Sequence, residues 1–276
     1  MTDAQGEVDR ASSDRAQDKW LLVSDVDNTV VAEGPDDHGA AERLAAHLGA
    51  ERSRLTVVYN SGRFVSSILQ TVTEHGLATP DVCVGGVGTE VRVCQGERVS
   101  LPAQEVLHGW PESSIDRWDA KQARQAVLRW TDAELQPAEF QSPYKVSFYL
   151  RDASAGQVKE LEGRLESLGV DASLIYSSDR DLDVLPRGLD KAAAAAFVAR
   201  ALGFPNDRVV VAGDSGNDRA MLNAGFLSVV VANAKPELAD LTGPRVFRSD
   251  ACYGDGVVQG LRHWMSAGRT AAQPGV

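Results

Sequence analysis

Cysteine and positive charge are both scarce in this sequence of 276 residues. Its three cysteines, Cys83, Cys94 and Cys252, form no Cys-x-x-Cys pair, which argues against a zinc site and against a disulfide framework. Reduced thiols are typical of cytoplasmic proteins, and the cytoplasm is the location that we expect. The formal net charge of -11 argues against a nucleic-acid partner, because phosphate backbones are bound by clustered Lys and Arg.

Long apolar runs are also absent. No stretch reaches the roughly 18 apolar residues that a membrane-spanning helix needs, so we expect no membrane partner. The polar N-terminus has no apolar stretch before Leu21, which argues against a secretory signal. Residues 1–18 and 268–276 show no periodicity, and we expect both to be disordered tails.

What the sequence does contain is an alternation of short apolar strands and amphipathic helices. Residues 20–24 and 55–59 are strongly apolar and stop abruptly at polar residues, as buried parallel strands do at their carboxyl ends. The same rhythm returns after Pro186, with strands predicted at 209–212 and 227–231. The alternation predicts an α/β protein whose core is a doubly wound parallel sheet.

The pattern changes between these two regions. Helices predicted at 111–133 and 153–168 stand among strands that look antiparallel, which indicates an inserted α+β unit. We therefore assign residues 19–88 and 185–267 to the core and residues 89–184 to an inserted cap domain.

Two acids follow the first predicted strand, at the end where ligands bind in open α/β sheets. Asp25 and Asp27 are two residues apart, so their carboxylates are expected to lie close together. Asp25 suits a nucleophile and Mg²⁺ ligand. Asp27 suits a general acid for the leaving oxygen and then a base for the attacking water. Taken alone, the pair is better explained as a solvated acidic turn.

A phosphate site is predicted where the second strand turns into a helix. The Ser61 hydroxyl and the free N–H groups of that helix suit a phosphate oxygen, and the flanking Asn60 and Gly62 are assigned to the same site. Lys191 opens a helix after the cap and would neutralise a phosphoryl group as negative charge develops. Individually, Ser61 is better explained by a helix N-cap and Lys191 by an ordinary surface lysine.

The fourth feature is the run Gly213-Asp214-Ser215-Gly216-Asn217-Asp218 after a later strand. Mg²⁺ takes hard oxygen ligands, usually one or two of them carboxylates, so Asp214 is predicted as a direct metal ligand. Asp218 is predicted either as a metal ligand through water or as the residue that orients Lys191, and Asn217 as a donor to phosphate. A simple Gly/Asp turn is the alternative, but four such features in order, each at a strand end, are far more specific than one.

These four segments together resemble the motifs of the haloacid dehalogenase (HAD) superfamily. The resemblance implies a Rossmann-like core, an aspartyl-phosphate intermediate, and Mg²⁺ held by Asp25, the backbone carbonyl of Asp27, and Asp214. The insertion of the cap between Ser61 and Lys191 resembles that of superfamily members with a C2-type cap.

Three further stretches, 80–91, 141–149 and 181–186, resemble sucrose-phosphate phosphatases. This resemblance implies a small-molecule sugar phosphate as substrate, with sucrose 6-phosphate, cleaved to sucrose and phosphate, as the first candidate. Mannosylfructose phosphate and glucosylglycerol phosphate are alternatives, and so is a non-catalytic regulatory HAD module. Residues 92–139 show little similarity, and Asp190 stands where a small residue is expected.

Four residues are assigned to the substrate's sugar, namely Thr89, Glu90, Gln141 and Lys145. Closure of the cap over the core would exclude water and add specificity through them. Glu90 could instead pair with a neighbouring cation. A sugar-phosphate synthase is a candidate partner, and the sequence leaves open whether water or a second sugar accepts the phosphoryl group.

Overall fold

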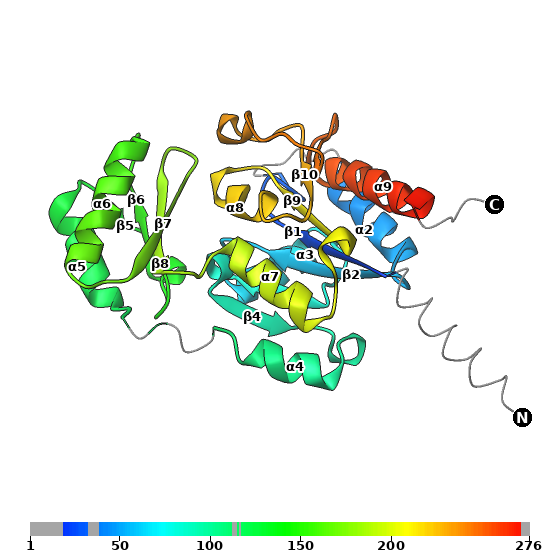
Figure 1. The fold of residues 1–276 in the computed structure, drawn as a ribbon, viewed down its shortest axis with the longest axis horizontal. Helices are drawn as coiled ribbons and strands as arrows, with labels where there is room; N and C mark the ends of the chain where they lie inside the picture. The colour runs from blue at the N-terminus through cyan, green and yellow to red at the C-terminus, as the bar shows by residue number, and fades with distance from the viewer. Residues whose placement is uncertain (1–18, 33–38, 112–114, 116, 272–276) are drawn as a thin grey trace, which may run out of the picture.

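Two β-sheets organise the molecule, and they lie side by side (Figure 1). The computed structural model describes residues 19–32, 39–111, 115 and 117–271. The predicted N-terminal tail and residues 272–276 lie outside these ranges. Within them, no helix has both the length and the apolar character needed to cross a membrane.

The larger sheet has seven strands in the order β11-β10-β9-β1-β2-β3-β4. Neighbouring strands are parallel, except for the antiparallel pair of β3 and β4. The strands are β1 (Trp20–Ser24), β2 (Leu55–Asn60), β3 (Val82–Gly85), β4 (Glu90–Val93), β9 (Val209–Gly213), β10 (Leu227–Val230) and β11 (Val246–Arg248). Because β1 is central, with β2 on one side and β9 on the other, the sheet is wound in both directions from its first strand, which confirms the predicted class.

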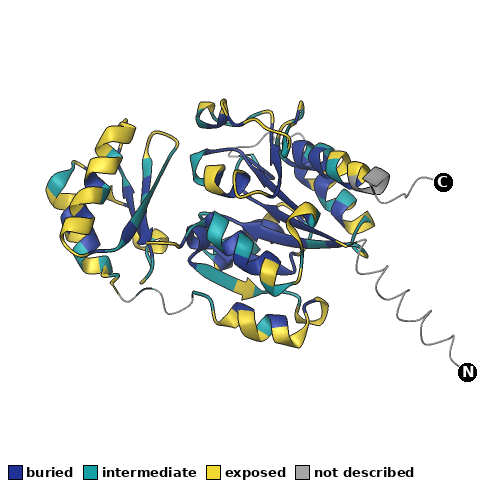
Figure 2. Ribbon diagram, in the orientation of Figure 1, coloured by how far each residue is buried: buried dark blue, intermediate teal, exposed yellow. Residues whose placement is uncertain are grey.

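Helices cover both faces of this sheet. They are α2 (Ala40–Ala50), α3 (Val65–Glu74), α4 (Leu101–His108), α7 (Lys191–Ala201), α8 (Arg219–Leu222) and α9 (Tyr253–Ala271). Side chains alternate along a strand, so Leu22 belongs to the apolar layer that contains α2, α3 and α9, while its neighbour Leu21 belongs to the layer that contains α4, α7 and α8. Figure 2 shows that burial is concentrated in the sheet and the inner sides of the helices. Each fully buried Leu or Val contributes about 1.5–3 kcal/mol of hydrophobic free energy.

The smaller sheet has four antiparallel strands in the order β5-β6-β8-β7. Its elements are α5 (Ala120–Trp130), β5 (Glu134–Leu135), β6 (Val146–Tyr149), α6 (Ala155–Ser167), β7 (Ala172–Ser177) and β8 (Asp181–Pro186). It has its own apolar cluster, in which Phe148 and Leu182 of the strands pack with Val127 of α5 and Leu165 of α6. This is the predicted inserted α+β unit, and we call it the cap.

The boundary of the cap differs from the predicted residue 89. Strand β4 pairs with β3 in the larger sheet and α4 packs against the same apolar layer, so residues 90–108 lie with the core. A short strand in a sequence gives no signal of which sheet it will join. At the other end of the chain, α9 continues to Ala271, past the predicted start of the C-terminal tail at residue 268.

Candidate active site

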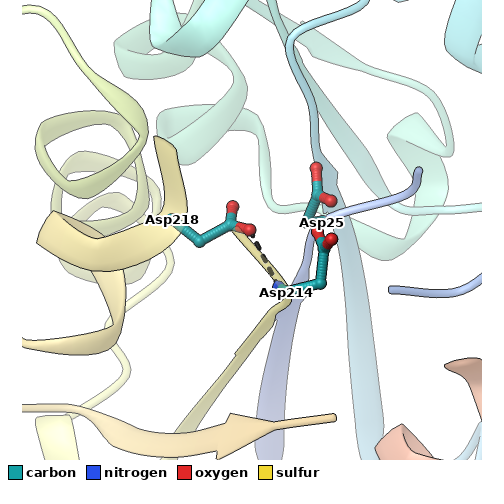
Figure 3. A group of neighbouring side chains, drawn as sticks. All are labelled: Asp25, Asp214 and Asp218. Carbon is teal, nitrogen blue, oxygen red and sulfur yellow. Dashed lines mark hydrogen bonds between the residues drawn. The ribbon is translucent and has the colours of Figure 1, made fainter. Parts of the chain in front are cut away.

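The acids of the first and fourth sequence features meet at the carboxyl ends of β1 and β9. These strands pair in parallel with Ser24 opposite Ala212, so Asp25 and Asp214 leave neighbouring strands at the same edge. Asp218 lies across from them, and one oxygen of each of the three carboxylates lies within 4.8 Å of the others (Figure 3). All three residues are buried. Residues 214–218 form a loop that we call the acidic loop. It is closed by Asp218 Oδ2, which accepts hydrogen bonds from the backbone nitrogens of Asp214 at 3.0 Å and Ser215 at 3.2 Å.

Lys191 is the cation of this cluster. Its Nζ lies 2.6 Å from Asp25 Oδ1 and 2.7 Å from Asp218 Oδ1, and it also donates to Asn217 Oδ1 at 3.0 Å. The side chain is completely buried at the start of α7. Asp190, the unexpected residue of the sequence, is the N-cap of this helix and accepts a hydrogen bond from the backbone nitrogen of Ala193 at 2.7 Å. It thus stabilises the turn that carries Lys191.

The electrostatics of the cluster are dominated by carboxylates buried away from water. Burial, with repulsion from Asp218, raises the pKa of Asp25 to about 7. Burial, with repulsion from Asp25, raises the pKa of Asp214 to about 8. Burial alone would lower the pKa of Lys191, but Asp218 and Asp25 hold it above its ordinary value. One ammonium thus faces three carboxylates, an excess of negative charge that a divalent cation would relieve.

Thr29, to which the sequence assigned no role, bridges two of the carboxylates. Its hydroxyl lies 3.2 Å from Asp25 Oδ2 and 3.3 Å from Asp214 Oδ1. One hydroxyl hydrogen serves one acceptor at a time, so Thr29 can donate to either carboxylate but not to both at once.

Asp27 is held by a residue that sequence reasoning missed. Arg63 Nε lies 2.9 Å from both Asp27 oxygens, and Arg63 Nη2 lies 2.7 Å from Oδ1. The Ser61 hydroxyl donates to Asp27 Oδ2 at 3.4 Å, so the first and second sequence features also meet. The only signal in the sequence was the position of Arg63, two residues after Ser61.

The residues that flank Ser61 have other contacts. Asn60 is fully buried, and its Nδ2 donates to the backbone oxygen of Lys191 at 2.9 Å, so it fixes the start of α7. The backbone oxygen of Gly62 accepts a hydrogen bond from Lys145 Nζ of the cap at 3.1 Å.

A cavity of about 500 Å³ connects the acidic cluster with the cap. Its core wall includes Asp25, Asp27, Asp214, Gly62 and Asn217. The cap wall is polar and includes Gln136, Lys145, Tyr149, Arg180, Asp181 and Asp183. Of the four residues assigned to the sugar, Lys145 lies here, where its Nζ is also 3.4 Å from Asp183 Oδ1.

The other three, Thr89, Glu90 and Gln141, line a neighbouring hollow that shares Phe64 with the first. Their side chains are engaged with the protein backbone. Thr89 Oγ1 donates to the oxygen of Gly86 at 2.9 Å, and Glu90 Oε2 accepts from the nitrogen of Val65 at 3.0 Å. The side-chain amide of Gln141 makes two hydrogen bonds with the backbone of Ser147. It donates to the backbone oxygen at 2.9 Å and accepts from the backbone nitrogen at 3.0 Å.

Comparisons with known proteins agree on one family. The family described as "Sucrose-6F-phosphate phosphohydrolase" matches residues 18–265. Mannosylfructose-phosphate phosphatase of Agrobacterium fabrum is 37% identical over 247 residues, which cover 88% of this chain and 96% of that protein. Probable sucrose-phosphatase 2 of Arabidopsis thaliana is 31% identical over 265 residues, which cover 89% of this chain and 60% of that protein. The chain therefore spans about three fifths of this plant relative.

A solved structure shows the same similarity. The sucrose-phosphatase of Synechocystis sp. PCC6803, determined in complex with sucrose and phosphate, is 26% identical in sequence with a TM-score of 0.79. The match covers 89% of this chain and 98% of that one.

Proposed function

Because this chain belongs to the sucrose-6F-phosphate phosphohydrolase family of the HAD superfamily and is a phosphatase of phosphoric monoesters, we propose that it is a Mg²⁺-dependent enzyme acting on sucrose 6-phosphate. Sugar phosphates are the class of substrate that its relatives' names support. One observation carries the proposal: the buried contact of Asp25 with Lys191 lies on a cavity whose opposite wall is the polar side of the cap.

Asp25 is the proposed nucleophile. Its carboxylate attacks phosphorus and forms the aspartyl phosphate, while the bond between phosphorus and the sugar oxygen breaks and Asp27 gives that oxygen a proton. Water then attacks phosphorus while Asp27 accepts a proton from that water, and the bond between phosphorus and Asp25 breaks to release inorganic phosphate and restore the Asp25 carboxylate. To transfer these protons, Asp27 must give up part of its ion pair with Arg63. Lys191, bound to Asp25 Oδ1, neutralises negative charge as it develops on the phosphoryl oxygens.

The acidic cluster fits Mg²⁺. Its donors are carboxylate oxygens, they are buried, and the raised pKa values of Asp25 and Asp214 mark uncompensated negative charge. Asp25, Asp214 and the backbone carbonyl of Asp27 would hold the ion, and the bound ion would supply charge neutralisation for the phosphate. Asp218 suits the orienting role better than the ligand role, because its two oxygens are engaged by Lys191 and by the loop backbone.

The cap wall suits a polyhydroxylated ligand. Carboxylates, an amide and an ammonium on Gln136, Lys145, Asp181 and Asp183 offer both donors and acceptors to sugar hydroxyls. The cavity volume of about 500 Å³ falls within the range of small-molecule sites. Mannosylfructose phosphate is the second candidate, because the relative that carries this name is 37% identical and matched over 96% of its length.

The test is inorganic phosphate release, with and without Mg²⁺, from sucrose 6-phosphate, mannosylfructose phosphate and glucosylglycerol phosphate. We expect sucrose 6-phosphate to have the highest kcat/KM of the three and Asp25→Asn to abolish turnover. Product analysis with added sucrose separates hydrolysis from transfer to a sugar acceptor. Wild-type turnover by Asp25→Asn would refute the mechanism, and an equal or higher kcat/KM for either of the other two substrates would refute the choice of sugar.

A further inference from the structure

One contact between core and cap lies outside the machinery described so far. Glu237 belongs to a short 3-10 turn of the core, Pro236–Leu238, and its Oε1 accepts a hydrogen bond from the backbone nitrogen of Ser178 in the cap at 3.0 Å. Neither residue has a part in the proposed chemistry.

The backbone of Glu237 is fixed to the acidic loop of the core. Two residues before it, the nitrogen of Lys235 donates to the backbone oxygen of Asp214 at 2.7 Å. Arg219, which follows Asp218, donates through Nη1 to the backbone oxygen of Glu237 at 2.6 Å. A movement of this turn would therefore displace the acidic loop, and the reverse also holds.

Ser178 stands at the tip of the hairpin that joins β7 to β8. Ser178 and Asp179 both have left-handed backbone, with φ of 56° and 50°, and the nitrogen of Arg180 donates to the oxygen of Ser177 at 3.2 Å. The two central residues therefore have the positive φ of a type I′ turn, and the N–H of the first central residue of such a turn has no partner within the turn. Glu237 supplies that partner from the other domain.

The hairpin tip matters because its neighbours along the chain face the cavity. Ser177 and Ser178 line the cavity, and so do Arg180 and Asp181 at the start of the second strand of the hairpin. Holding Ser178 thus holds the side of the cap that faces the sugar end of the substrate.

Gly216 of the acidic loop gives independent support for a close fit here. A Cβ at this position would lie 2.5 Å from Glu237 Oε2 and 3.3 Å from the backbone oxygen of Tyr176 in β7. A side chain at position 216 would displace the carboxylate of Glu237, so the loop, Glu237 and the cap hairpin pack closely at this glycine.

We propose that Glu237 is a positioning residue that holds the cap hairpin over the acidic loop and so sets the affinity for the sugar part of the substrate. The inference rests on the proposed sugar-phosphate substrate. Glu237 is not one of the residues that line the cavity, so we expect its effect to be confined to substrates large enough to reach the cap.

The kinetic test compares Glu237→Ala with wild type on the sugar phosphate that wild type prefers and on acetyl phosphate, which is too small to fill the cavity. Loss of a hydrogen bond to a charged acceptor should raise KM for the sugar phosphate about tenfold. The kcat/KM for acetyl phosphate should stay unchanged. Glu237→Gln keeps an acceptor oxygen, so its KM for the sugar phosphate should lie between those of wild type and Glu237→Ala.

Asp207→Asn is the matched control. Asp207 is an exposed acid of the core, in the 3-10 turn Asn206–Arg208. It should keep the wild-type KM. A parallel loss of activity on both substrates in Glu237→Ala would overturn the proposal, because it would place the effect in the core.

Amide hydrogen exchange at Ser178 reads the contact directly and needs no substrate. We expect faster exchange at Ser178 in Glu237→Ala and wild-type exchange in Asp207→Asn; unchanged exchange in Glu237→Ala would overturn the proposal. If wild type cleaves acetyl phosphate and no sugar phosphate, the proposed substrate fails, while this exchange result still decides whether Glu237 holds the hairpin.

Discussion

The ammonium nitrogen of Lys191 lies 2.6 Å from Oδ1 of Asp25, although the two residues are 166 positions apart in the chain. The contact joins the first strand of the core to the first helix after the cap. It is completed by Asp218, which binds the same nitrogen at 2.7 Å. The groups around this pair can each be tested by substitution or by titration.

Replacing Lys191 with Met should lower kcat by a factor of about 100 to 1,000, because the positive charge at the nucleophile is lost. It also leaves buried carboxylates without their partner, which costs about 3–5 kcal/mol of stability in comparable sites. Steady-state kinetics and thermal unfolding check both effects. Lys159→Met, on the exposed side of α6, should behave as wild type. Near-normal turnover by Lys191→Met would contradict the assignment.

Asn60→Ala should lower kcat about tenfold with little change in KM. Asn60 fixes Lys191 through a buried hydrogen bond to its backbone, and such a bond is worth roughly 0.5–1.5 kcal/mol, with a further cost for the acceptor left unsatisfied. Kinetics at saturating substrate measure this loss of kcat, and Asn223→Ala, at an exposed position, is the control. A rise in KM with unchanged kcat would favour the predicted direct contact with phosphate instead.

Without metal, the protein should become less stable as pH rises. Asp25 and Asp214 have folded-state pKa values of about 7 and about 8 against an ordinary 3.8, so between these values the folded state binds more protons than the unfolded state. Stability is therefore fully present below about pH 4 and is lost as pH rises through 7 to 8. Thermal unfolding in EDTA from pH 5 to 8.5 should show this slope. Added Mg²⁺ should flatten it, and Asp25→Asn should reduce it; a Tm that rises over this range would contradict the prediction.

Arg63→Ala should impair substrates with poor leaving groups more than those with good ones. Arg63 holds Asp27, the proposed acid, and a displaced acid matters most where the leaving oxygen needs a proton. We expect about a tenfold loss of kcat on a sugar phosphate and a smaller loss on p-nitrophenyl phosphate. Arg124→Ala, on the exposed face of α5, serves as control. Equal losses on both substrates would argue for a purely structural role.

The sequence predicted the core of the site because its residues follow strands whose pairing is strongly determined. Residues 20–24 and 209–212 are apolar almost throughout, and parallel strands end at one edge, so Asp25 and Asp214 had to be neighbours once these strands paired. Asp190 was an anomaly in the sequence and an N-cap in the structure, which shows that local helix chemistry explained a departure from the family pattern.

The cap was harder to predict because its contacts are not local. Gln141 and Lys145 are both polar and close in sequence, but Gln141 is bound to the backbone of Ser147 while Lys145 reaches the cavity. Nothing in their order along the chain distinguishes them. The helix predicted over 111–133 begins only at Ala120, because the side chain of Asp119 caps it by accepting from the nitrogens of Lys121 and Gln122.

The central position of β1 has a consequence for synthesis on the ribosome. Leu21 pairs with Val209, so the first strand cannot complete its hydrogen bonds until nearly two hundred later residues have been made. Among the residues that the structure describes, the apolar cluster of the cap spans Trp118 to Val184, so the cap is complete before β9 leaves the exit tunnel. The inserted domain should therefore fold first, and the half-built sheet with its exposed edge at β1 should be the species most prone to aggregate.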